Sequence, residues 1–168
     1  MRVVNAVAVV LALASAVEAQ APGEPALGPS VFWGSLCRAQ GCVEGVDGAG
    51  AGVRGALPLG DWVVGEAAGI YWYGSTRSET VRRVSLFLTA RFYPSRGSAA
   101  FVRAGGGLSW DLDEGPAHPA GVLGVGWDIR GWLGGTVTPF LDAALFGPPE
   151  PLPALRLVSG GVELAWPF

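Results

Sequence analysis

From Val31 to the last residue, runs of alternating apolar and polar positions are separated by breakers rich in Gly and Pro. Such alternation indicates strands, because successive side chains of a strand point to opposite faces. Eight strands are expected, over residues 31–38, 49–59, 62–73, 81–93, 100–111, 120–130, 136–146 and 155–168. They are long for a soluble protein, but they suit the roughly 9–11 residues that a tilted strand needs to cross a bilayer.

The connections between these runs alternate in length. PLGD, PSRGS and RGWLGG are tight, whereas RAQGCVEGVDG, GSTRSE, DLDEGPAHP and FGPPEPLPA are mostly longer and richer in Pro or charge. Outer-membrane barrels have an even strand number, short periplasmic turns and longer outside loops. With both termini in the periplasm, the longer connections would all face outside. The pattern therefore predicts an all-β fold, an eight-stranded antiparallel up-and-down transmembrane β-barrel.

The character of the two faces favours lipid outside the barrel. The run 81–93 sets Val84, Leu86 and Leu88 opposite Arg83. In the later runs the polar face is largely Gly, Ser and Thr with isolated charges, which suits the crowded interior of a narrow barrel. A soluble exported lipid-binding barrel would have its apolar face inside and stays an alternative. The run 62–73 has bulky residues on both faces, so its orientation stays open.

The N-terminus has the pattern of an export signal. Residues 1–19 contain Arg2, an apolar stretch, and small residues where a signal peptidase cuts, so cleavage is expected after Ala19. Residues 20–30 are expected to be a Pro/Gly linker and residues 31–168 the barrel. Half of the residues are hydrophobic, yet no later apolar run approaches the ~20 residues of a membrane helix. This combination predicts the bacterial outer membrane.

Candidate chemistry is sparse. Cys37 and Cys42 have a C-x4-C spacing rather than C-x-x-C, and export through an oxidising periplasm favours a disulfide between them. His118 is the single histidine, and Ser109 and Asp111 lie near it, but no hydrolase motif surrounds them. The chain is therefore expected not to be an enzyme, with no metal and no cofactor. The sequence has no basic patch that would indicate binding to nucleic acid.

Six charged residues are expected to face the lumen. Arg54 and Glu66 are symmetric about Gly60, so a simple hairpin would set them opposite each other. The whole set is Arg54, Glu66, Arg91, Arg103, Asp128 and Glu163. These residues are expected to form one layer near the periplasmic half of the lumen and to plug it, because a buried lone charge is costly. Alternatively, several of them reach water independently.

The chain resembles the small eight-stranded outer-membrane β-barrels, such as the barrel of outer-membrane protein A. The stretches that carry the resemblance are VFWGSL, GEAAGIYWYGS, LFLTARFYP, FVRAGGGLSWDL, VLGVGWDIR, TPFLDAALFG and VELAWPF. The resemblance implies that Trp166 and Phe168 act as an insertion signal for the barrel-assembly machinery. The resemblance indicates the fold more firmly than the biological function.

The sequence thus predicts a non-enzymatic integral outer-membrane protein with a structural or surface-interaction role. Its expected partners are outer-membrane lipid and, during insertion, the barrel-assembly machinery, and it is expected to be a monomer. A narrow gated pore and an outer-membrane lipid-modifying enzyme stay open as alternatives.

Overall fold

The computed structural model describes residues 24–38, 41–76, 80–113, 115–147 and 155–168. These residues form strands and no helix, and none of them lies in a helix long and apolar enough to span a membrane. The strands are β1 (Ala26–Arg38), β2 (Gly41–Pro58), β3 (Val63–Ser75), β4 (Thr80–Phe92), β5 (Ala100–Asp111), β6 (His118–Trp127), β7 (Ile129–Trp132), β8 (Gly135–Phe146) and β9 (Leu155–Pro167). The predicted signal peptide lies outside the described residues, so its cleavage stays a prediction.

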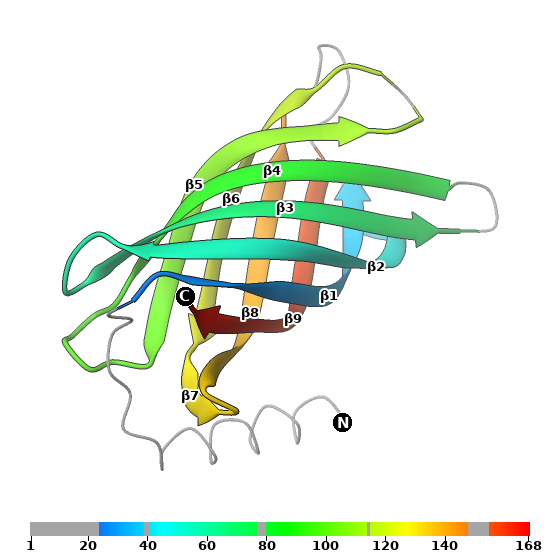
Figure 1. Cartoon of the computed structure of the whole chain (residues 1–168). Helices are drawn as coiled ribbons and strands as arrows, with labels where there is room; N and C mark the ends of the chain where they lie inside the picture. The colour runs from blue at the N-terminus through cyan, green and yellow to red at the C-terminus, as the bar shows by residue number, and fades with distance from the viewer. Residues whose placement is uncertain (1–23, 39–40, 77–79, 114, 148–154) are drawn as a thin grey trace.

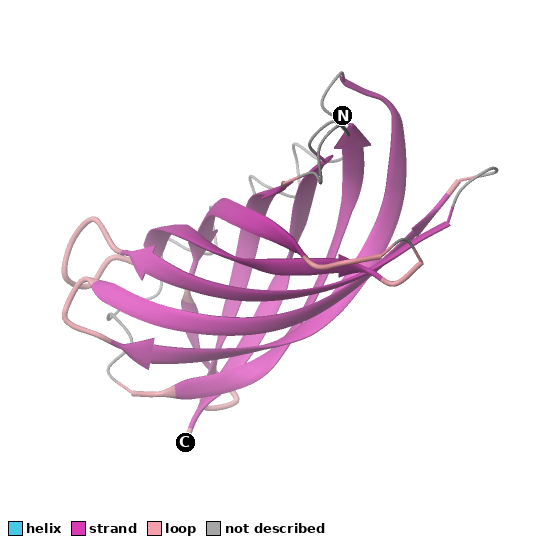
Figure 2. Ribbon diagram, turned by 90° about the horizontal axis from the view of Figure 1, so that it is seen from above, coloured by secondary structure: helices cyan, strands magenta, loops and turns pink. Residues whose placement is uncertain are grey.

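The strands pair antiparallel and close into a barrel (Figure 1). Figure 2 shows the sheet curling around the lumen, and the pairing of β6 with β8 completes the circle. Stepping from Ala26 to the paired residue on each successive strand returns to β1 at Leu36, ten residues further on. With ~3.3 Å per residue and ~4.8 Å between strands, this stagger tilts the strands by roughly 40°, as closed barrels require.

β6 and β7 are two parts of one barrel strand. Both pair with β8, in one register from Ala120 to Arg130, and the break between them falls at Asp128. Pro139 of β8 lies opposite this break, and proline has no N–H to donate to the ladder. The Thr138 hydroxyl instead donates a hydrogen bond of 2.7 Å to the Asp128 carboxylate across the gap. The barrel therefore has eight strands, which confirms the predicted fold class.

The strand boundaries follow the predicted runs closely except in the first two strands. β2 begins at Gly41 rather than at residue 49, so most of the predicted connection RAQGCVEGVDG is part of the barrel wall. β1 begins inside the predicted linker 20–30, so residues 26–30 belong to the barrel. The linker prediction failed there because Pro and Gly usually mark loops. Pro29 is paired with β2, whereas the ladder to β9 is interrupted between Leu27 and Ser30. Pro29, which has no N–H, therefore lies where the pairing of β1 with β9 is interrupted.

The outer face of the barrel is apolar along the middle of its strands. Its exposed large side chains include Leu27, Val31, Trp33, Val53, Leu57, Leu86, Leu88, Val102, Leu108, Leu123, Val125, Leu141, Leu145 and Val158. Among the strand side chains that the structure describes, the charged ones that point outward are Asp47, Arg82 and Arg156, all toward one end of the barrel. Such a surface would promote aggregation in water, but it matches the lipid-facing band of an outer-membrane barrel.

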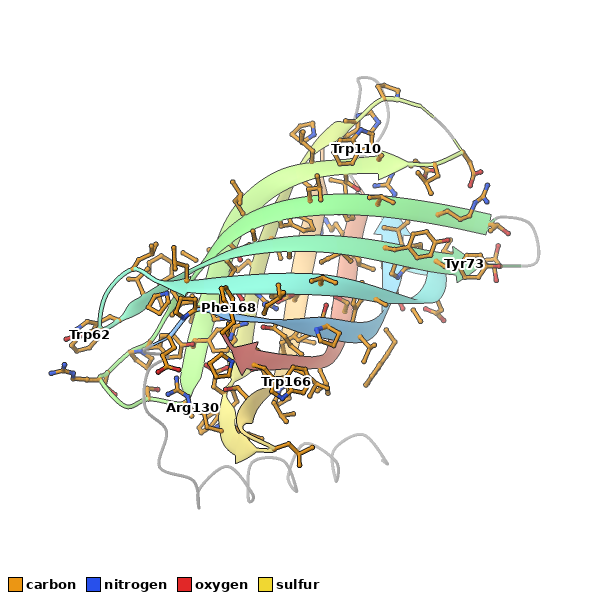
Figure 3. The ribbon with its side chains drawn as sticks, viewed as in Figure 1. Trp62, Tyr73, Trp110, Arg130, Trp166 and Phe168 are labelled. Carbon is orange, nitrogen blue, oxygen red and sulfur yellow. The ribbon has the colours of Figure 1, made fainter. Side chains whose placement is uncertain are left out.

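Aromatic side chains occupy both ends of this apolar face. Figure 3 shows Tyr73 at the opposite end of β3 from Trp62, with Trp110 near the Tyr73 end. Trp166 and Phe168 lie toward the other end, where the chain terminates. Two aromatic levels that bracket an apolar band are the expected arrangement at the two interfaces of a membrane.

The inner face contains aromatic side chains as well as charges. Inward positions of β3 carry Glu66 and Trp72, while Tyr71 and Tyr73 of the same strand are exposed, which settles the orientation that the sequence left open. Buried apolar rings inside the barrel include Phe32, Trp72, Phe87, Phe140 and Phe146. The expectation of an inner face made mostly of small residues and charges was therefore incomplete.

Inward glycines make room for these rings. Phe32 lies directly opposite Gly50, and a Cβ added at Gly50 would be 2.1 Å from the ring. Phe101 lies opposite Gly126 in the same way, at 2.3 Å. Real Cβ atoms do not approach so closely, so the small residues of one strand and the large residues of its neighbour fill the narrow lumen together.

Candidate functional site in the lumen

The six predicted lumen charges all face inward and are buried. Arg103 is fully buried, Glu163 is 2% exposed, and the other four are each 4% exposed. Arg54 comes from β2, Glu66 from β3 and Arg91 from β4, so the network draws on strands from around the barrel. Asp128 lies at the break between β6 and β7. The structure brings all six side chains into one connected group.

One detail of the predicted pairing was wrong. The register sets Arg54 opposite Ala68 and Glu66 opposite Ala56, so Arg54 and Glu66 are diagonal neighbours. The hairpin is centred on Asp61 rather than Gly60, and moving the centre by one residue moves every pair by two. The Arg54 and Glu66 side chains still approach to 3.7 Å. Arg91 and Arg103 are symmetric about Gly97 in the sequence, and they do lie directly opposite each other.

Arg91 is the centre of the network. Its Nε donates a hydrogen bond of 2.7 Å to Glu66, its Nη1 donates one of 3.1 Å to Asp128, and its Nη2 pairs with Glu163. The guanidinium also lies over the ring of Phe101, 4.5 Å from the ring centre. One cation therefore compensates three carboxylates from three different parts of the barrel wall.

Each of the two glutamates contacts all three arginines. Arg54 approaches Glu163 to 3.0 Å, and Arg103 approaches Glu66 to 3.6 Å and Glu163 to 3.5 Å. Together with the contacts of Arg91, these ion pairs place positive and negative groups next to one another across the lumen. Such mutual compensation is what charges need when they are held away from water.

Sequence reasoning missed several members of the network. Arg103 Nη2 donates to both oxygens of Asp142, at 2.8 and 2.6 Å. The Tyr93 hydroxyl donates to Asp128 at 2.7 Å, and the Thr89 hydroxyl donates to Glu66 at 2.8 Å. Asp142 alternates with the apolar Leu141 and Ala143 in the predicted strand 136–146, so the sequence pattern could have identified it as an inward residue. With Asp142 included, three arginines meet four carboxylates.

A second charged level lies toward the other end of the lumen. Arg83 Nε is 3.5 Å from Asp111, and the Arg83 guanidinium lies 4.8 Å from the centre of the Phe146 ring. The Ser85 hydroxyl donates a hydrogen bond of 2.9 Å to Ser109 nearby. The lumen is thus charged near both ends and apolar between them.

Ser109, His118 and Asp111, the residues considered for catalysis, do not contact one another as a catalytic triad would. Ser109 and His118 are paired across β5 and β6, but no hydrogen bond joins them among the contacts of the described residues. Ser109 is fully buried against Ser85, and Asp111 contacts Arg83. The described residues also include no group of three or more His, Cys, Asp or Glu that could hold a metal ion.

The predicted disulfide cannot be followed to its second residue. Cys37, near the end of β1, is 1% exposed. The side chain of Cys42 lies outside the described part of the chain, so the pairing stays a prediction.

The terminal strand has the predicted parity. Glu163 is buried, whereas Trp166 is 37% and Phe168 84% exposed on the outside. The Phe168 N–H donates a hydrogen bond of 3.2 Å to the Pro25 carbonyl. The last residue is therefore held by a backbone hydrogen bond while its ring is exposed.

Changing Phe168 to Asp is expected to reduce insertion into the membrane severalfold, because it removes the terminal aromatic and adds a charge at the apolar edge. The measurement is the amount of heat-modifiable barrel in isolated membranes, with Arg96→Asp in an exposed turn as the control. A normal yield of barrel for Phe168→Asp would contradict the expected role of Phe168 as an insertion signal.

Comparison with solved structures identifies several barrels of the same architecture. The Neisserial surface protein A superposes with a TM-score of 0.69 at 10% identity, covering 86% of this chain and 97% of that chain. Ail, the attachment invasion locus protein of Yersinia pestis, gives 0.60 at 8% identity, covering 88% of this chain and all of that chain. A de novo designed transmembrane β-barrel gives 0.51 at 10% identity, covering 88% and 98%.

No protein-family model and no curated protein matches the sequence. At identities of 8–10% the structural matches concern the fold alone. The designed barrel reaches the same architecture with an unrelated sequence, which supports the same limit. The apolar outer face, the charged lumen and these superpositions agree that the chain has the fold of the small eight-stranded outer-membrane β-barrels.

Proposed function

We propose that the chain is a non-enzymatic integral protein of the bacterial outer membrane, with a plugged lumen and a structural or surface-interaction role for its outer loops. One observation carries this proposal: a charge-free apolar band surrounds a lumen whose buried charges compensate one another. A soluble barrel would have these two faces exchanged. Outer-membrane lipid and the barrel-assembly machinery are the partners, and the barrel works as a monomer.

The charge network acts as the plug in this proposal. Side chains nearly fill the interior of an eight-stranded barrel, and here Arg54, Arg91 and Arg103 bridge carboxylates from opposite walls. Planar-bilayer recording is expected to give no stable conductance steps for the unmodified protein. Regular single-channel steps would instead favour the narrow gated pore.

A surface role is supported by the placement of the longer connections. The turns after β2, β4 and β7 lie at the end where the chain terminates, and the strand ends that the other connections join lie at the far end (Figure 1). Ail is named for attachment and invasion, which makes a comparable interaction of these loops worth testing.

Epitope tags test the orientation. A tag after Pro116, between β5 and β6, is expected to be labelled on intact cells, because this connection faces outside. Tags at Gly60 or Arg96, in the turns after β2 and β4, are expected to be labelled only after the outer membrane is opened. Labelling of either turn on intact cells would contradict the orientation.

Replacement of His118 tests the enzyme alternative. The Ser109 hydroxyl accepts a hydrogen bond from Ser85, no hydrogen bond among the described residues joins it to His118, and Asp111 contacts Arg83, so a Ser-His-Asp relay has no support from these contacts. His118→Ala is expected to leave the lipid composition of the membrane unchanged. Loss of a modified lipid in this variant would instead support the alternative that the protein is a lipid-modifying enzyme.

A further inference from the structure

The turn between β7 and β8 holds a leucine in a backbone conformation that leucine disfavours. Trp132 pairs with Gly135, so the turn consists of Leu133 and Gly134, whose φ angles are 50° and 76°. Positive φ at both central residues is typical of a type I′ turn, which prefers Asn, Asp or Gly at the first of them. A leucine at that position is strained, and strained residues persist where something compensates for the strain.

The same leucine is strongly exposed. Leu133 is 77% exposed, which is more than Leu88, at 72%, in the lipid-facing band. An apolar side chain in this position adds little to the packing of the barrel and is unfavourable in water. An asparagine would relieve both the strain and the exposure, so neither the turn nor solubility explains the leucine. Contact with an apolar environment outside the chain would explain it.

The level of the turn identifies that environment. A Cβ added at Gly135, the residue after the turn, would lie 3.0 Å from the ring of Trp166, which belongs to the aromatic level at this end of the barrel (Figure 3). Leu133 is two residues further along, which is at most ~7 Å at ~3.3 Å per residue. The headgroup region on each side of a bilayer is roughly 5–8 Å thick. Leu133 therefore lies at the depth of the lipid headgroups.

The other turns at this end have contrasting characters. In the turn after β2, Leu59 is 65% exposed, and its Cδ1 would be 3.0 Å from a Cβ at Gly65 on the outer face of β3. This leucine therefore lies along the lipid-facing surface. The turn after β4 carries Arg96 instead, 77% exposed and paired with Asp61. Apolar and charged turns thus occur at the same end, and the charged one supplies a control.

We infer that Leu133 anchors the β7–β8 turn in the headgroup region of the adjacent leaflet, with its side chain against the upper part of the phospholipid acyl chains. Removal of the leucine from water compensates for the strain of the turn. The occupant is lipid because the turn continues directly from the aromatic level of the lipid-facing band. This inference rests on the membrane location proposed above, and it adds a lipid contact for a turn that the strands leave outside the bilayer core.

Quenching of a fluorescent label tests the depth of the turn. Leu133→Cys, Leu88→Cys and Arg96→Cys are made singly in a background with Cys37→Ala and Cys42→Ala, labelled with the same small fluorophore and placed in phosphatidylcholine nanodiscs. Iodide in the buffer is expected to quench the label at position 133 at least threefold less than the label at position 96. Lipid with a spin label near its headgroup is expected to quench position 133 more strongly than position 96.

The three positions separate failure of this inference from failure of the proposed location. Equal iodide quenching at positions 133 and 96, with position 88 protected, would overturn the anchor and leave the barrel in its membrane. Iodide quenching at position 88 as well would instead contradict the membrane location itself.

Leu133→Asn separates lipid contact from backbone strain. Asparagine tolerates positive φ better than leucine, so strain alone predicts a higher midpoint of urea unfolding in vesicles for this variant. Loss of a lipid contact predicts a lower midpoint, and a decrease of roughly 0.3–0.5 M urea is expected. Ser95→Asn, in the turn after β4, is the control and is expected to leave the midpoint in place. An unchanged or raised midpoint for Leu133→Asn would overturn the inference.

Discussion

Replacing Arg91 with Ala is expected to destabilise the barrel by about 3–5 kcal/mol, the cost typical of removing one partner from a buried ion pair. Arg91 is 4% exposed and contacts Glu66, Asp128 and Glu163. Its loss leaves three carboxylates in a narrow space with too few cations. Unfolding by denaturant in lipid vesicles, followed by tryptophan fluorescence, measures the change.

The double variant Glu66→Ala with Arg91→Ala shows whether the network acts as a unit. Because these side chains contact each other, the double variant is expected to be less destabilised than the sum of the two single variants. It is also expected to conduct ions where the unmodified barrel does not. Arg96, 77% exposed beside Asp61, is the control, and its Ala variant should change stability by roughly 1 kcal/mol at most. Small additive effects with unchanged conductance would eliminate the plug.

Replacing Leu88 with Arg is expected to cost about 2–4 kcal/mol, the penalty for an arginine near the middle of the bilayer on the lipid face of a barrel. Leu88 is 72% exposed and lies on the outer face well inside β4. Its neighbours across the sheet are Ala67 and Gly106, which offer the new charge no partner. The same vesicle unfolding experiment measures the effect.

Leu112 provides the matched control. It is 53% exposed but lies just beyond β5, toward the loops. Leu112→Arg is expected to cost about 0–1 kcal/mol, because the penalty falls near the interface. Equal effects of the two variants would mean that depth in a membrane is irrelevant. A neutral Leu88→Arg would indicate that the outer face is in water.

The strands and their two faces could be predicted because alternation is a local property. Glu66, Arg91 and Glu163 were placed inward by counting along single strands, with no knowledge of the register. The same alternation places Asp142 inward as well. Asp142 was not included in the predicted layer of charges because it lies further from the nearest turn than the other members. Local pattern therefore identifies what faces the lumen, but not how far each side chain reaches.

The partners across the lumen could not be predicted, because they depend on the centre of each turn and on the stagger of the closed barrel. The turn centred on Asp61 rather than Gly60 changed the partner of Arg54. Aromatic residues were harder still, since Phe32 and Phe87 have the same chemistry as lipid-facing residues. Their inward position depends on glycines in neighbouring strands, such as Gly50, which leave space for the rings.

Separation of cell membranes by density tests the central claim most directly. The broken-cell extract is divided into soluble, inner-membrane and outer-membrane fractions, and the membranes are then washed with alkaline carbonate and finally dissolved in detergent. The chain is predicted to occur in the outer membrane, to resist carbonate and to be released by detergent with heat-modifiable migration. Recovery in the soluble fraction, or release by carbonate alone, would contradict a barrel whose apolar face lies in lipid.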